Sequence, residues 1–180
     1  MTATTGRERA LSWDEYAALP EDSRVEYVDG HLLVSPSPTR RHQRIRHVLT
    51  SAVAAVLPEG HEVISAWEWK PGADAFVPDV MVYERAAVTG EERFTGTPAL
   101  VVEVLSTNRR DDLLLKMTKY AQVGLPRYWV VDPRERTLTT LVLDDGAFRP
   151  TRVLEAAAGE VELDAGPARL VLDVGALVAD

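Results

Sequence analysis

The chain has 180 residues, a length that suits one domain with a proper hydrophobic core. Its apolar share of 46% and charged share of 27% are ordinary for a globular protein, and the absence of cysteine excludes disulfides, thiolate chemistry and Cys-based zinc sites. A formal net charge of -8 argues against a protein that coats nucleic acid without specificity, because such proteins are normally basic.

The start of the chain, "MTATTGRERALSW", has no apolar core, so no secretory signal is visible there. No apolar run approaches the roughly 20 residues that a membrane-spanning helix needs. Together with the lack of cysteine, these features lead us to expect a cytoplasmic protein with no membrane partner.

Near the N-terminus, two local signals define a short helix and a hairpin. In "SWDEYAALP", Ser12 and Glu15 have the spacing of a capping box, and Pro20 ends the helix that they begin. In "RVEYVDGHLLVS", two strand-like runs are joined by Asp29 and Gly30, a pair typical of a two-residue hairpin turn.

Residues 39–57 carry apolar side chains at helical spacing, which predicts a helix with one buried side. Those apolar positions are Ile45, Leu49, Val53, Val56 and Leu57. Residues 61–70 and 75–83 then predict two strands, and a charged loop follows over residues 84–97.

The rest of the chain alternates strands with one further helix. Its expected elements are a buried strand at 99–106, a helix at 109–123 ended by Gly124 and Pro126, a strand at 127–133 and a hairpin at 137–150 that turns at Asp145 and Gly146. The segment after residue 150 contains only short apolar runs. We therefore predict an α/β (α+β) protein, residues 1–180 forming one domain around a central mixed sheet flanked by helices, with an N-terminal hairpin and a C-terminal β extension.

Three acidic residues lie inside apolar runs: Glu26 in "RVEYV", Asp79 in "VPDVMVY" and Glu103 in "LVVEVL". Glu26 could lie on a half-exposed hairpin, and Asp79 follows Pro78, which suggests a strand start. Glu103 has the weakest structural explanation, because an ionised carboxylate in a buried strand costs several kcal/mol unless a cation or strong donors meet it.

Two carboxylates on neighbouring strands would repel each other, and a divalent cation would remove that penalty. The lack of Cys ligands favours an oxygen site for Mg²⁺ or Mn²⁺, in which water and a substrate phosphate complete the shell. We expect such a cation, shared by Asp79 and Glu103, to be the counter-charge of Glu103. Lys116, one helix later, could position a water or stabilise the transition state, or could simply pair with Asp112 on a solvated helix face.

These residues lie within longer motifs. "VPDVMVY" and "PALVVEVLSTNRRDDLLLKMTKYAQVGLPRYWVVDP" closely resemble the restriction endonuclease-like family of the PD-(D/E)XK nuclease superfamily. "RVEYVDGHLLVSPSPTRRHQRI" resembles that family's Glu-x-x-x-Gly hairpin, followed by a His-Gln helix. The resemblance covers about residues 11–150 and leaves 151–180 as an extension. It implies a helix-flanked sheet, a Mg²⁺ site and phosphodiester hydrolysis.

The resemblance also implies roles for single residues. The family's aspartate falls on Asp79, its strand glutamate on Glu103 and its hairpin glutamate on Glu26, which would assist through a second metal or an outer-shell contact. The backbone carbonyl of Val104 would be a further metal ligand.

One position departs from the wider fold. The lysine expected two residues after the glutamate is replaced by Leu105. In this family the following helix supplies the lysine, and Lys116 matches that position.

Basic residues concentrate in 39–47 and 108–119, where they could grip a phosphate backbone or form two solvated helix faces. The expected nucleic-acid contacts are Arg40, His42, Arg44, Ser106, Arg109 and Lys119. Structural alternatives stay open for two of them, His42 as an ordinary helix-face residue and Ser106 as a helix cap. Lys119 could also substitute for Lys116.

The sequence therefore predicts a Mg²⁺- or Mn²⁺-dependent DNA endonuclease that acts as a homodimer, since cutting both strands of a duplex needs two sites. Two alternatives are a catalytically inactive nuclease fold that binds DNA or regulates, and an interaction protein with only solvated charges.

Overall fold

The computed structural model describes residues 11–20, 25–34, 37–106 and 110–179, with residues 110–112 described by their backbone alone. In chain order the elements are α1 (Trp13–Ala17), β1 (Val25–Val28), β2 (His31–Val34), α2 (Arg40–Ala54), β3 (His61–Ile64), β4 (Val80–Glu84), the 3-10 helix η1 (Arg85–Ala87), β5 (Leu100–Val104), α3 (Arg110–Gln122), β6 (Arg127–Asp132), β7 (Thr137–Asp144), β8 (Ala147–Glu155), the 3-10 helix η2 (Ala156–Ala158), β9 (Glu160–Asp164), β10 (Arg169–Asp173) and α4 (Val174–Leu177).

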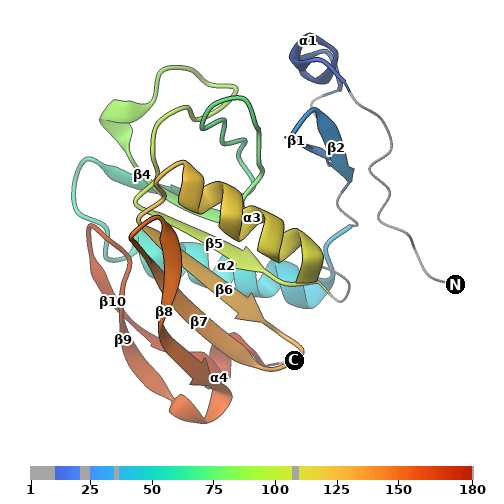
Figure 1. The fold of residues 1–180 in the computed structure, drawn as a ribbon. Helices are drawn as coiled ribbons and strands as arrows, with labels where there is room; N and C mark the ends of the chain where they lie inside the picture. The colour runs from blue at the N-terminus through green and yellow to red at the C-terminus, as the bar shows by residue number, and fades with distance from the viewer. Residues whose placement is uncertain (1–10, 21–24, 35–36, 107–109, 180) are drawn as a thin grey trace, which may run out of the picture.

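Six strands form the central sheet in the order β3-β4-β5-β6-β7-β8. Strands β5 and β6 pair in parallel, and the other neighbours in this sheet pair antiparallel. Helix α3 makes the crossover that the parallel pair needs. Two hairpins, β1-β2 and β9-β10, form separate small sheets (Figure 1). The predicted mixed sheet with flanking helices, N-terminal hairpin and C-terminal β extension is confirmed.

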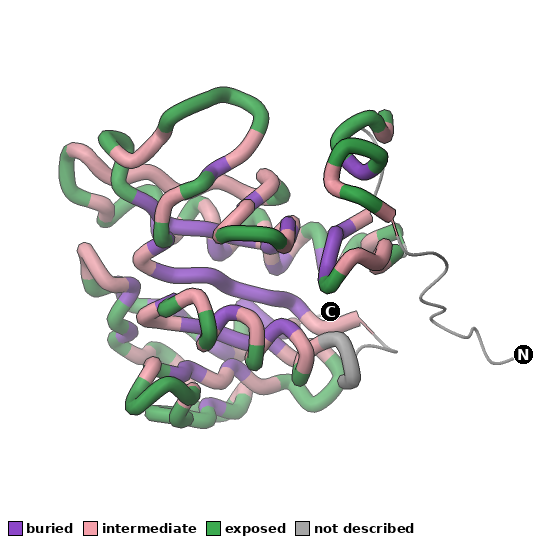
Figure 2. Tube along the Cα trace, turned by 45° about the horizontal axis from the view of Figure 1, so that its top comes forward, coloured by how far each residue is buried: buried purple, intermediate pink, exposed green. Residues whose placement is uncertain are grey.

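The sheet separates two hydrophobic clusters, because alternate residues of each strand point to opposite faces. On one face, Ile45 and Leu49 of α2 pack with Val102 of β5 and with the C-terminal hairpin and α4. On the other face, Tyr120 of α3 packs with Val101 of β5. The central strands are buried along most of their length (Figure 2). Position 103 belongs to the face covered by α3.

The N-terminal signals are confirmed. Ser12 and Glu15 form the predicted capping box of α1. Asp29 and Gly30 form the turn between β1 and β2, both with positive φ (51° and 75°), as this tight turn requires. A bridge between Tyr27 and Ala75 connects this hairpin to the rest of the protein.

The two long helices also follow their sequence signals. Thr39 caps α2, and its side chain accepts a hydrogen bond from the amide of His42, in the first turn, at 3.2 Å. Helix α2 ends at Ala54, three residues before the predicted boundary. Helix α3 is followed by Gly124 with φ of 77°, a conformation that closes a helix end.

The strands predicted at 61–70 and 75–83 are shorter than expected. Pro78 lacks an amide donor, and β4 begins only after it, at Val80. The segment between β3 and β4 is instead held by bridges of Trp69 to Phe76 and to Phe94. Phe94, in the predicted charged loop, is fully buried and anchors that loop to the core. Among the described residues, no helix is long and apolar enough to cross a membrane.

Candidate active site

Asp79 and Glu103 meet where strands β4 and β5 lie side by side. The antiparallel register pairs Val80 with Val102, so the next pair outward along the strands is Asp79 opposite Glu103. Asp79 lies just outside the ladder, and its Oδ2 accepts the amide of Val104 at 2.8 Å. The two carboxylates predicted to share a site therefore come together at the end of this strand pair.

Lys116 lies between two of the acidic residues. Its Nζ atom is 3.0 Å from Oε1 of Glu103 and 2.8 Å from Oε1 of Glu26. All three side chains are at least 93% shielded from solvent. The side chain of Asp112, the alternative partner of Lys116, lies outside the described residues. The counter-charge of Glu103 in this structure is the Lys116 ammonium, where the sequence predicted a divalent cation.

Burial dominates the ionisation of Glu103. It raises the pKa of this carboxyl to about 7, although the ammonium of Lys116 acts in the opposite direction. The nearby carboxylates of Asp79 and Glu26 raise it further, because they disfavour another negative charge. Near neutral pH Glu103 can thus gain or lose a proton, and any added cation would favour the ionised form.

Glu26 reaches the site from the β1-β2 hairpin. Its Oε1 atom also accepts the amide of Val77 at 2.7 Å, just before β4. Its Oε2 atom is buried and makes no hydrogen bond with the described residues. A buried carboxylate oxygen without a donor is costly, so this atom is available for water or a cation.

Two tyrosines complete the environment of Glu103. The hydroxyl of Tyr120 donates to Oε1 of Glu103 at 2.9 Å. Burial first, and then the charge of Glu103, raise the pKa of Tyr120 well above its usual range, so this donor keeps its proton. Tyr128 lies on β6 on the same face, and its buried hydroxyl has no partner among the described residues.

His42 approaches Asp79 from the opposite side of the sheet. Its Nε2 atom lies 2.6 Å from Oδ1 of Asp79. His42 is buried on α2. Ile45 and Leu49 of the same helix belong to the hydrophobic cluster on the sheet face away from α3. The structure therefore places His42 against a carboxylate, where the sequence predicted a phosphate contact.

The donor set suits a hard divalent cation. Asp79 and Glu103 offer oxygen ligands, and Lys116 and Tyr120 both donate to Oε1 of Glu103. No group of three or more acidic, His or Cys side chains among the described residues is arranged to hold a metal. Two carboxylates are enough for Mg²⁺, because water, main-chain carbonyls and substrate phosphate usually complete its shell. The carbonyl of Val104 stays a predicted ligand.

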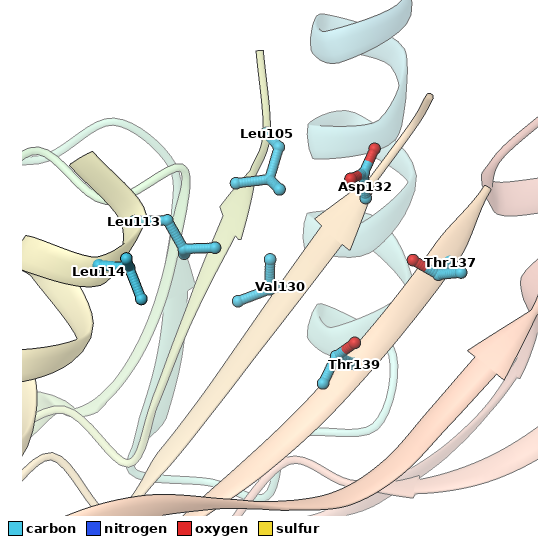
Figure 3. A pocket seen from close by; sticks show the side chains of 7 residues that line it. All are labelled: Leu105, Leu113, Leu114, Val130, Asp132, Thr137 and Thr139. Carbon is cyan, nitrogen blue, oxygen red and sulfur yellow. The ribbon is translucent and has the colours of Figure 1, made fainter. Parts of the chain in front are cut away.

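An open groove of about 310 Å³ adjoins the site on the α3 face (Figure 3). It lies between the start of α3, the C-terminal ends of β5 and β6 and the start of β7. Its lining is mostly apolar and consists of Leu105, Leu113, Leu114, Val130, Asp132, Thr137 and Thr139. Because Val130 is the strand partner of Glu103, the groove begins one strand away from that carboxylate.

The predicted nucleic-acid contacts do not form one cluster. Arg40 is exposed at the start of α2. Arg44 donates to the carbonyls of Leu177 at 2.7 Å and Ala179 at 2.6 Å, near the C-terminus. Ser106 follows β5, and its hydroxyl is buried without a described partner. Arg109 lies outside the described residues.

Lys119 is held by two carboxylates. Its Nζ atom contacts Oδ1 of Asp29 and lies 3.0 Å from Oδ2 of Asp74. The other oxygen of Asp74 accepts the amide of Asp29 at 2.9 Å. Lys119 therefore fastens the turn of the β1-β2 hairpin to α3, one helical turn from Lys116.

The sequence prediction missed Tyr120 as a member of the site. A usable signal was present, because Tyr120 lies four residues after Lys116 and thus on the same side of the helix. The link between His42 and Asp79 had no such signal, since it joins helix α2 to the residue just before β4, which lies 37 positions further along the chain.

Comparisons with known proteins agree with this architecture. The solved structure of a protein from Anabaena variabilis, described as "a putative nuclease belonging to DUF820", superposes with a TM-score of 0.79 at 21% identity, over 93% of this chain and 97% of that one. This likeness shows a shared fold. The comparison with curated proteins found no match. A family model described as "Putative restriction endonuclease" matches residues 13–175, which confirms the resemblance found in the sequence. Because that match spans most of the chain, the protein belongs to this family, Uma2.

Proposed function

We propose that the protein hydrolyses phosphodiester bonds in DNA with the help of Mg²⁺ or Mn²⁺. The observation that carries this proposal is the convergence of Asp79, Glu103 and Lys116 from three separate elements onto one point of the sheet. Membership of a family described as "Putative restriction endonuclease" supports the same reaction class.

Asp79 and Glu103 would hold the cation, with the Val104 carbonyl as a further ligand. When bound, Mg²⁺ activates water and neutralises charge that develops on the phosphate. Lys116 holds its ammonium beside Glu103, where it can orient the attacking water and stabilise the transition state. Tyr120 fixes Glu103 by its hydrogen bond, so the carboxylate keeps its orientation while the charge around it changes.

Glu26 supports the lysine in this scheme. One oxygen of Glu26 contacts Lys116, so the buried ammonium has a second counter-charge besides Glu103. The other oxygen is free for an outer-shell water.

The substrate path would start from exposed Arg40 and pass Ser106 at the end of β5. Arg109 is proposed as a further phosphate contact. The apolar groove beside Glu103 leaves space for an uncharged part of the substrate. Cutting both strands of a duplex needs two sites, so we also propose a two-fold dimer, which light scattering can test.

A plasmid-nicking assay with Mg²⁺ or Mn²⁺ tests the function. We expect wild type to nick, and Asp79→Asn and Glu103→Gln to lose at least 100-fold in rate, the size of loss typical for a group that stabilises the transition state. Glu62→Gln is the matched control, because Glu62 lies on β3 and pairs with Arg85 away from the site. Equal nicking by wild type and Glu103→Gln would show a contaminant and defeat the proposal.

The same assay separates the proposal from an inactive nuclease fold. That alternative predicts DNA binding without nicking, and binding that Asp79→Asn and Glu103→Gln leave intact. One feature of the structure favours the inactive fold: Lys116 and Tyr120 both donate to Oε1 of Glu103, so this oxygen already has two partners that a metal would have to share.

A further inference from the structure

The carboxylate of Asp79 is held at both oxygens. Oδ1 lies 2.6 Å from His42 Nε2, and Oδ2 accepts the Val104 amide at 2.8 Å. Asp79 itself precedes β4 and takes no part in the β4-β5 ladder. Its orientation therefore depends on these two contacts, and rotating the carboxylate would break a charge-assisted hydrogen bond.

His42 is built into the fold as a donor for this bond. His42 lies in the first turn of helix α2, and its backbone amide donates to the Oγ1 atom of the capping residue Thr39 at 3.2 Å. The side chain is 90% shielded from solvent, and its Nδ1 atom is buried without a partner among the described residues. Nε2 is therefore the ring atom that faces Asp79, where it can donate one hydrogen bond to the carboxylate.

A fixed carboxylate still has room for a cation. Each oxygen of an ionised carboxylate has about two acceptor positions, and His42 and Val104 each use one. His42 thus restricts the direction of Asp79 and leaves acceptor positions of the carboxylate open.

We propose that His42 is a positioning residue, which acts through Asp79 to prepare the site for a divalent cation. The inference rests on the proposed function. Outer-shell partners of metal-binding carboxylates typically contribute 10- to 100-fold to metal affinity, and we expect the same range here.

The experiment measures Mn²⁺ binding to the full chain by electron paramagnetic resonance, without nucleic acid and at fixed pH. Two amide variants form the critical pair. His42→Gln places an amide donor about where Nε2 lies, whereas His42→Asn carries the same donor on a side chain one methylene too short. We expect His42→Asn to weaken Mn²⁺ binding about 10- to 100-fold and His42→Gln to stay within a few-fold of wild type.

A second histidine on α2 provides the control. His47 is exposed on the same helix, so His47→Asn should leave Mn²⁺ affinity unchanged. Thermal unfolding of each variant checks that it is folded, and His42→Phe tests whether ring packing alone is sufficient.

Three results would overturn the inference. They are equal affinity of His42→Asn and wild type, an equal loss in the Asn and Gln variants, and full affinity in folded His42→Phe. A wild-type protein that binds no Mn²⁺ would overturn the proposed function first. Nicking activity that is intact in wild type, together with unaffected Mn²⁺ binding in His42→Asn, would defeat only the role of His42.

Discussion

The Nζ atom of Lys116 lies 2.8 Å from Oε1 of Glu26, and the β1-β2 hairpin and α3 meet at this contact. The same ammonium is 3.0 Å from Glu103. One buried cation thus holds two buried carboxylates, which makes Lys116 a structural residue as well as a candidate for catalysis. This double role leads to the first prediction.

Replacing Lys116 by Met should destabilise the protein by about 3–5 kcal/mol, because two buried carboxylates lose their counter-charge. Mn²⁺ should restore part of this loss, since a divalent cation can take the place of the ammonium. Denaturant unfolding with and without Mn²⁺ measures both effects.

A double variant provides the control for Lys116→Met. Adding Glu103→Gln removes one of the stranded charges and should recover part of the stability. If Lys116→Met costs less than about 1 kcal/mol, a value within the range of an exposed ion pair, the buried arrangement is not what stabilises this region.

The ionisation of Glu103 predicts a pH dependence of stability in the metal-free protein. Burial raises the pKa of Glu103 from 4.5 to about 7, so the folded state binds a proton more tightly than the unfolded state does. The stabilisation is therefore complete below pH 4.5 and is lost as the pH rises through about 7. We expect this contribution to be on the order of 1–3 kcal/mol.

Glu103→Gln should remove this pH dependence of stability, because a glutamine amide does not titrate. Urea unfolding at a series of pH values, wild type against Glu103→Gln, gives the comparison. Parallel curves for the two proteins would contradict the prediction.

The cluster around Lys119 predicts an effect on the hairpin that carries Glu26. Lys119→Met removes the contacts with Asp29 and Asp74, so amide hydrogen exchange in β1 and β2 should speed up. Arg149→Met is the control, since Arg149 pairs with Asp144 in the β7-β8 hairpin of the central sheet and not with β1 or β2.

DNA binding distinguishes this role from the predicted phosphate contact. If Lys119→Met lowers the salt dependence of DNA binding and leaves hydrogen exchange unchanged, Lys119 contacts phosphate and the hairpin interpretation is wrong.

Arg40 and Arg44 lie one helical turn apart on α2 and should respond in opposite ways. Arg40 is exposed, so Arg40→Ala should weaken DNA binding and reduce the salt slope by about 1, with little change in stability. Arg44 donates to the carbonyls of Leu177 and Ala179, so Arg44→Ala should cost about 1–3 kcal/mol of stability. Binding isotherms at several salt concentrations and thermal unfolding test both variants. The reverse pattern would show that Arg44 is the phosphate contact.

The sequence by itself determined the local elements and the acidic residues of the site. The capping box joins Ser12 to Glu15, three residues later, and the hairpin turn is formed by the adjacent residues Asp29 and Gly30. Local sequence patterns were therefore sufficient to predict both elements. Glu103 could be identified because an ionised carboxylate within an apolar, buried run is costly unless another group compensates its charge.

Tertiary structure alone decided which of these residues meet. The contacts of Lys116 with Glu26, of His42 with Asp79 and of Arg44 with the C-terminal carbonyls join distant segments of the chain. They depend on the register of β4 against β5 and on how α2 and α3 are rotated about their axes over the two faces of the sheet. Hydrophobic packing of whole elements sets these variables, and no local pattern of residues encodes them.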